Sequence, residues 1–151
     1  FLKNLLRPDA IASQAAAGVL SEKPDLFGRL LVMIALPGTQ GFYGFITAIM
    51  ICLRIGLMAG TVRIGLMAGI GLFILGACVG MAQLISAICQ GEASAAGIGL
   101  VARRPDASGR ALLFPAMVET YAVVALLAGV LVTIWITNES LLTPLAQAVT
   151  Q

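Results

Sequence analysis

Between Ala111 and Thr137 the chain carries one acid and no base, which constrains its fold more than any other feature of the sequence. The acid is Glu119, and its neighbours are side chains suited to the hydrocarbon of a membrane. Only 11% of the chain is charged, whereas a soluble domain has about a quarter of its residues charged. We therefore expect an all-α, polytopic, integral membrane protein. An ionised carboxylate is costly in hydrocarbon, so Glu119 indicates an ion or substrate path.

Composition also excludes several classes of function. The net charge of +2, without a dense basic cluster, argues against nucleic acid as a partner. The absence of histidine excludes imidazole metal ligands, imidazole-based triads and histidine proton relays. Neither a P-loop nor a GxGxxG motif is present, so any nucleotide chemistry belongs to another subunit. The cysteines have no metal-like spacing, and we interpret them as small apolar residues in helix interfaces: Cys52, Cys78 and Cys89.

Apolar runs separated by polar breaks predict the organisation of the chain. Four helical segments are expected, at about 9–20, 27–54, 63–101 and 109–137. The first would cover only about half of a ~30 Å hydrocarbon core, so it is interpreted as a truncated transmembrane helix. The predicted division is a first hairpin at 1–53, a connection at 54–63, a second hairpin at 64–137 and a polar tail at 138–151.

An internal repeat supports two tandem hairpins. A shift of 79 residues places Ala16-Ala17-Gly18 on Ala95-Ala96-Gly97, and the same shift places Gln40 beside Glu119. Each copy then carries one polar group at mid-depth, a neutral amide in the first and a carboxyl in the second.

A shorter repeat, RIGLMAGTV-RIGLMAGIG, occupies residues 54–71, where a polar loop is expected. We interpret it as a tandem duplication that lengthens the connection, with Arg54 and Arg63 reaching the lipid headgroups. The third segment also contains a small-residue series that predicts close helix packing and an inner position in an assembly: Gly65, Gly69, Gly76 and Gly80.

The second helix presents a polar face around Pro37. Spacing i, i+3, i+4, i+7 places four residues on this face: Leu36, Thr39, Gln40 and Tyr43. Proline lacks an N–H group and pushes on the carbonyl four residues earlier, so we expect a bend here that exposes backbone oxygens.

The third helix adds Gln90 and the fourth adds Glu119, giving one carboxylate among neutral oxygen groups. This composition suits a small, hard monovalent cation, and Na⁺ is the preferred ion. The alternative for Thr39, Gln40 and Gln90 is simple interhelical hydrogen bonding. Gln83 is interpreted as a packing residue, and Glu92 is expected to face away from the site.

Three motifs carry a resemblance to a known family: LPGTQGFYGF, SAICQGEASAAGI and MVETYA. Over roughly residues 13–136 the chain resembles the double-hairpin proteolipid, or subunit K, of V-type and A-type rotary ATPases. The resemblance implies a homo-oligomeric rotor ring in a prokaryotic cell membrane, in contact with lipid. It also implies a stator subunit with an essential arginine and a central-stalk subunit as partners. Such a subunit moves ions and catalyses nothing alone, and its rotation is coupled to ATP hydrolysis or synthesis.

The resemblance also implies a set of site residues. In the sodium-pumping members the ion is held by a leucine carbonyl, a threonine, two glutamines and the essential glutamate. The matching positions here are Leu36, Thr39, Gln40, Gln90 and Glu119. Tyr43 matches the tyrosine that hydrogen-bonds to the glutamate.

Two alternatives remain at this stage. One is the proton-coupled version of the same subunit. The other is a small cation or drug antiporter, although such proteins typically place their glutamate in the first helix, among aromatic residues.

Overall fold

The computed structural model describes residues 8–62 and 64–138, and all regular structure in these ranges is helical. The predicted all-α class is therefore confirmed. The helices are α2 (Pro8–Glu22), α3 (Phe27–Ala35), α4 (Thr39–Arg54), α5 (Leu66–Arg103) and α6 (Ser108–Ile136). Four 3₁₀ turns lie between them: η1 (Pro24–Leu26), η2 (Leu36–Gly38), η3 (Leu57–Ala59) and η4 (Pro105–Ala107). Arg63 and all of the predicted tail beyond Asn138 lie outside the described residues.

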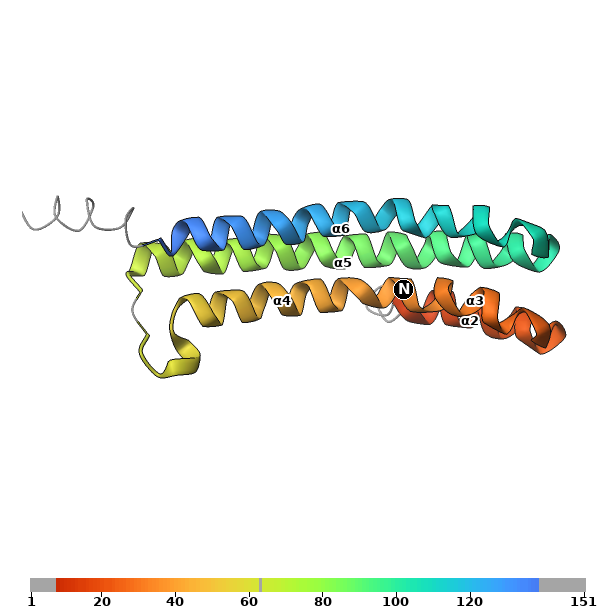
Figure 1. The fold of residues 1–151 in the computed structure, drawn as a ribbon, viewed down its shortest axis with the longest axis horizontal. Coiled ribbons are helices and arrows are strands. Elements are labelled where there is room, and N and C mark those ends of the chain that lie inside the picture. The colour runs from red at the N-terminus through yellow and green to blue at the C-terminus, as the bar shows by residue number, and fades with distance from the viewer. Residues whose placement is uncertain (1–7, 63, 139–151) are drawn as a thin grey trace, which may run out of the picture.

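The helices form an elongated bundle (Figure 1). The antiparallel pair α5 and α6 makes its most extensive contact, α3 and α4 follow one another along this pair, and α2 lies beside α3 at one end. Among the described residues, three segments are long and apolar enough to cross a membrane: Pro24–Arg54, Leu66–Arg103 and Pro105–Ile136. The protein is thus an integral membrane protein, as its composition predicts.

Pro37 interrupts the membrane-capable segment Pro24–Arg54. The chain forms the 3₁₀ turn η2 there, because the proline nitrogen cannot donate to the carbonyl of Met33. The carbonyl of Leu36 then accepts the backbone N–H of Thr39. The turn between α3 and α4 therefore presents this carbonyl and the Thr39 side chain together, in the middle of the bundle.

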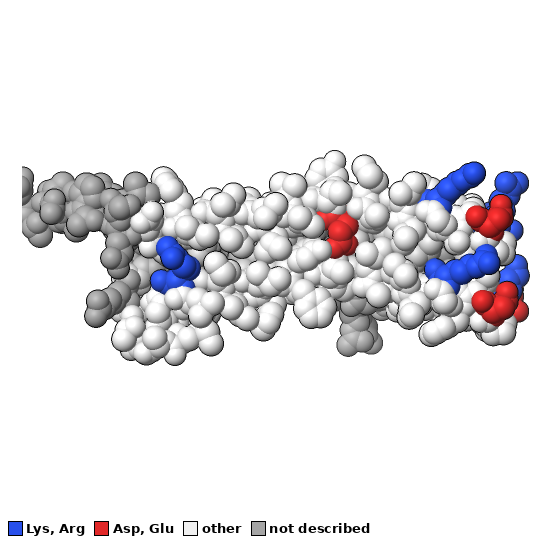
Figure 2. Space-filling model, viewed as in Figure 1, with Lys and Arg blue, Asp and Glu red and all other residues white. Residues whose placement is uncertain are grey.

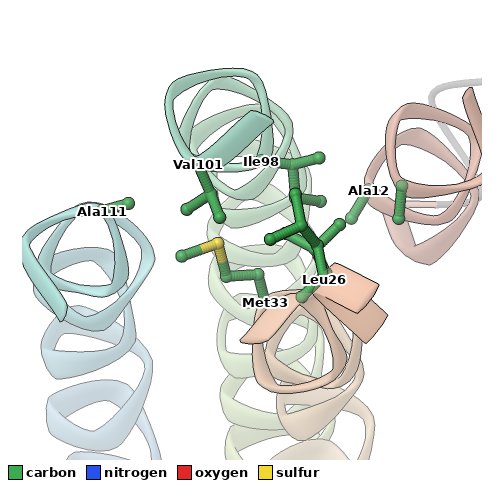
Figure 3. Packing of buried hydrophobic residues seen from close by; sticks show 8 residues of the cluster. Ala12, Leu26, Met33, Ile98, Val101 and Ala111 are labelled. Atoms are coloured by element: carbon green, nitrogen blue, oxygen red, sulfur yellow. The ribbon is translucent and has the colours of Figure 1, made fainter. Parts of the chain in front are cut away.

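The fully buried apolar cluster lies at the end where the two hairpin turns meet (Figure 3). Leu26, Leu30 and Met33 pack there against Ile98 and Val101, together with three alanines: Ala12, Ala16 and Ala111. This packing fixes the depth of the first hairpin against α5, and so sets the height of the polar turn around Pro37.

Two glycines outside the predicted series allow the closest approaches between helices. A Cβ atom on Gly97 would lie 3.1 Å from the carbonyl oxygen of Ala111, and one on Gly129 would lie 2.9 Å from Val79 Cγ2. Pro115, inside α6, removes the helical N–H donor of that same Ala111 carbonyl. The absence of a side chain at Gly97 therefore lets α5 lie against a carbonyl that lacks its helical partner.

The predicted glycine series makes no comparable approach within one copy of the chain. The space around Gly65, Gly69 and Gly80 is open, and the nearest atom to a Cβ on Gly76 is Ile51 Cδ1 at 3.8 Å. The series is expected to pack inside an assembly of several copies, and that stays a prediction; within one copy, the rotation of α5 turns a different face toward α6.

Charged side chains gather at one end of the bundle, beside η1 and η4 (Figure 2). Two of them link the hairpins: Lys23 Nζ donates to the carbonyl of Ala102, and Arg29 donates to that of Pro105, both at 2.6 Å. At the other end Arg54 Nε donates to Thr137 Oγ1 at 2.8 Å. Of the cysteines interpreted as interface residues, Cys52 is partly covered, whereas Cys78 and Cys89 are exposed in one copy.

Candidate cation site

The hydroxyl of Thr39 lies at the centre of a cluster of oxygen atoms. Its Oγ1 is 2.8 Å from the carbonyl oxygen of Leu36, 2.8 Å from Glu119 Oε1 and 3.5 Å from Gln40 Oε1. A hydroxyl has a single hydrogen to donate, and none of these three oxygens carries one when the glutamate is ionised. One hydrogen therefore serves two short contacts, either shared between them or present in only one. A proton on Glu119 or a bound cation would stabilise the crowded oxygens.

The carboxyl of Glu119 comes from α6 and accepts hydrogen bonds from two other helices. Tyr43, on α4, donates its hydroxyl hydrogen to Oε1 at 2.5 Å. Gln90, on α5, donates through Nε2 to Oε2 at 2.5 Å. Glu119, Thr39 and Tyr43 are half-buried. The groups that hold the acid are all neutral, so an ionised carboxylate receives no compensating charge from them.

The two glutamines form the buried side of the site. Gln40 is 2% exposed and Gln90 is completely buried. Gln40 Nε2 donates to Gln90 Oε1 at 2.5 Å, and Gln90 Nε2 donates to the carbonyl of Pro115 at 3.0 Å as well as to Glu119. Both N–H groups of Gln90 are therefore used, and its orientation is fixed between α4 and α6.

Three side chains of α5 hold the backbone of α6 around Glu119. Besides Gln90, Gln83 Nε2 donates to the carbonyl of Ala122 at 2.9 Å, and Ser86 Oγ donates to that of Val118 at 3.4 Å. The three donors have the spacing i, i+3, i+7, which places them on one face of the helix. The carbonyls they contact lie before and after Glu119 in the sequence. This arrangement fixes the height and rotation of α6 at the carboxyl.

Sequence reasoning gave part of this arrangement. The structure brings Leu36, Thr39, Gln40, Tyr43, Gln90 and Glu119 into one cluster. Glu92 is exposed, as expected for a residue on another face of α5. Gln83, interpreted as a packing residue, is 4% exposed and also hydrogen-bonded, and its Oε1 has no partner among the described residues. Ser86 was missed, although its spacing from Gln83 and Gln90 is a usable signal.

The oxygen atoms of this cluster suit one kind of bound ion. The described residues contain no group of three or more His, Cys, Asp or Glu side chains that could hold a metal ion. One carboxylate with a hydroxyl, the amide oxygen of Gln40 and a backbone carbonyl can balance a single positive charge. Gln90 presents its Nε2 to the carboxylate, and its Oε1 accepts from Gln40. With that charge bound, the site is neutral, which lowers the cost of keeping the carboxylate at membrane depth.

Comparisons with known proteins identify the family of the chain. The family model for the C subunit of ATP synthase matches residues 9–51 and 55–132. The chain is 39% identical, over 115 residues, to the V-type sodium ATPase subunit K of Enterococcus hirae, covering 75% of this chain and 69% of that protein. It is 40% identical, over 121 residues, to the A-type ATP synthase subunit K of Methanocaldococcus jannaschii, covering 80% of this chain and 50% of that protein.

Proposed function

The chain belongs to the family of the ATP synthase C subunit, and on that premise we propose that it is a rotor-ring subunit of a V/A-type ATPase that carries Na⁺ across a prokaryotic membrane. The observation that supports a cation site is the crowding of oxygens around Thr39, where one hydroxyl hydrogen serves two short contacts. Either a proton on Glu119 or a bound Na⁺ would supply the missing positive charge, and the neutral carbonyl and amide oxygens beside the carboxylate favour Na⁺. The name of the Enterococcus relative, a sodium ATPase subunit, points to the same ion.

The proposed ligands are the oxygens of five residues: Leu36, Thr39, Gln40, Gln90 and Glu119. For Gln90 this requires the side-chain amide to turn over when the ion binds, because its Nε2 faces Glu119 in the structure. Glu119 supplies the only formal charge among them, so it decides whether the site is occupied. Tyr43 donates to the carboxylate and holds it in place, and the α5 side chains keep α6 from turning the carboxyl outward. Release of the ion requires that at least one of these restraints is broken.

In the proposed cycle, Glu119 receives the ion at a neighbouring stator subunit, and the neutral site then turns past lipid. A stator arginine displaces the ion at the exit, since it offers the carboxylate an alternative positive partner. A central-stalk subunit transmits the rotation to the nucleotide sites of the complex.

The decisive experiment is chemical labelling of Glu119 by a carbodiimide, which reacts with the protonated carboxyl. In the assembled ring, Na⁺ at constant pH should slow the labelling, and K⁺ at the same concentration should not. Labelling that depends on pH but is indifferent to Na⁺ would favour the proton-coupled version of the subunit. Glu119→Gln should insert into the membrane, fail to label and abolish transport.

The mass of the assembly separates this proposal from an antiporter. A closed ring of many copies is expected, whereas a dimer that exchanges cations would favour the antiporter.

A further inference from the structure

The connection between α4 and α5 contains the heptapeptide RIGLMAG twice, and its two copies fold differently. In the first copy Arg54 ends α4, and Gly56 and Gly60 adopt positive φ values of 74° and 67° on either side of η3. In the second copy Gly65 is extended, with ψ 155°, and Leu66 begins α5. After Arg54 and Ile55, the first copy thus leaves the helix, and residues Gly56–Val62 form a separate structural unit, here called the knob.

The backbone of the knob satisfies several of its own polar groups. The carbonyl of Gly56 accepts the N–H of Ala59 at 3.2 Å and that of Thr61 at 3.1 Å, and Gly60 N–H donates to the carbonyl of Leu57 at 3.2 Å. A Cβ atom on Gly56 would lie 2.6 Å from the Thr61 carbonyl oxygen, so the turn requires glycine there. Internal hydrogen bonding lowers the cost of moving backbone out of water.

Apart from Thr61, the side chains of the knob are apolar, and its larger ones are exposed. Leu57 is 53% exposed, Met58 72% and Val62 54%. The knob turns to the side of α4 that lies away from α5 and α6, instead of extending the bundle along its length (Figure 1). Leu66 and Met67, at the start of α5, are exposed as well. A solvated loop would be polar, so this surface requires an apolar cover.

The depth of the knob can be inferred from the arginines of the same membrane segment. Arg29 and Arg54 are 25 residues apart, which corresponds to about 37 Å of helix, compared with a hydrocarbon core of ~30 Å. With Arg29 at one headgroup layer, Arg54 reaches the opposite one, and the knob begins two residues later. The connection from Arg54 to Gly65 contains two arginines and no acid.

We propose that the knob is a lipid anchor: Leu57, Met58 and Val62 enter the boundary between headgroups and acyl chains, and Arg54 binds a lipid phosphate. The guanidinium group presents a planar fork of N–H groups that fits a phosphate, and Nε–H is already held by Thr137. We assign the occupant as lipid and not a protein, because the surface follows directly on the exposed apolar side chains at the end of α4, Ile49 and Leu53, in a segment long enough to cross the membrane. This inference does not depend on which ion the site carries.

Quenching of a fluorescent label tests the position of the knob. Met58→Cys is labelled with an environment-sensitive dye, in full-length protein whose native cysteines are replaced by alanine, in vesicles of phosphatidylcholine and phosphatidylglycerol. The control is Asp106→Cys, in the charged turn η4 at the other end. Lipids with a spin label near the headgroup should quench the dye at position 58 several-fold more than at 106, and aqueous iodide should show the reverse preference.

Each remaining outcome would overturn the anchor. Strong iodide quenching at both positions would place the knob in water. Protection from both quenchers at position 58 would mean that protein covers it. The arginine is tested separately: Arg54→Gln should reduce the rise in lipid quenching that accompanies an increased share of phosphatidylglycerol, and Arg54→Lys should retain part of it. An unchanged response to phosphatidylglycerol in Arg54→Gln would remove phosphate binding from the proposal.

Discussion

Replacing Thr39 by valine removes one oxygen from the centre of the candidate site and preserves the shape of the side chain. The hydroxyl oxygen lies 2.8 Å from both the Leu36 carbonyl and Glu119 Oε1. Interactions of this kind with a charged group contribute about 1.5–3 kcal/mol. At about 1.4 kcal/mol for each factor of ten, the affinity for Na⁺ should fall about 10- to 150-fold.

The assay is the Na⁺ concentration that protects Glu119 half-maximally from a carbodiimide, measured on assembled rings at fixed pH. Thr39→Val should raise this concentration by the factor just given, and Thr39→Ser, which retains the oxygen, should stay near the original value. Thr47→Val is the matched control on the same helix, because the buried hydroxyl of Thr47 donates only to the carbonyl of Tyr43 at 3.0 Å.

An unchanged half-protecting concentration in Thr39→Val would refute the reasoning. The oxygen cluster would then be an arrangement of helix packing without a role in cation binding. A comparable loss in Thr39→Val and Thr47→Val would point to a general disturbance of α4, and would equally remove the special role given to the central hydroxyl.

Three further variants test the packing and restraint of the site. Gly129→Ala should destabilise the assembled protein by about 1–3 kcal/mol in thermal dissociation, because its methyl group meets Val79 at 2.9 Å, and the added change Val79→Ala should restore most of the loss. Gln83→Leu should leave stability unchanged or raise it by about 1 kcal/mol, since it removes a buried oxygen without a described partner at the cost of one bond to the carbonyl of Ala122. A clear loss would mean that the bond to Ala122 outweighs the unpartnered oxygen, or that the assembled ring supplies that oxygen with a donor. Tyr43→Phe removes a hydrogen bond to the carboxylate, so carbodiimide labelling without Na⁺ should become faster at equal pH, and an unchanged rate would show that this tyrosine does not restrain the acid.

Local sequence rules predict the helices and the polar face around Pro37 because both depend on spacing along a single helix. The fourth expected segment, 109–137, differs from α6 by one residue at each end. Tertiary pairing is harder to predict, since it depends on how far each helix is rotated. Within the subunit the close approaches between helices occur at Gly97 and Gly129, and spacing along α5 or α6 alone does not identify either position.

The hydrogen bond from Gln90 to the carbonyl of Pro115 is hard to predict for the same reason, because it depends on how two helices pair. It requires α5 and α6 to meet in one register, and nothing in either helix alone specifies that register. The depth of Glu119 could be read from its apolar neighbours, but the identity of its hydrogen-bond donors on α5 depended on the assembled hairpin.

The doubled heptapeptide has a consequence for how the connection between α4 and α5 can evolve. Excision of residues 55–63 would join Arg54 directly to Ile64, so the junction would again read RIGLMAG. Every amino acid of α4 and α5 would be retained, while the protruding apolar turn would be lost in one event. Recombination between the two copies can therefore add or delete the whole unit cleanly, without touching the oxygens in the middle of the bilayer.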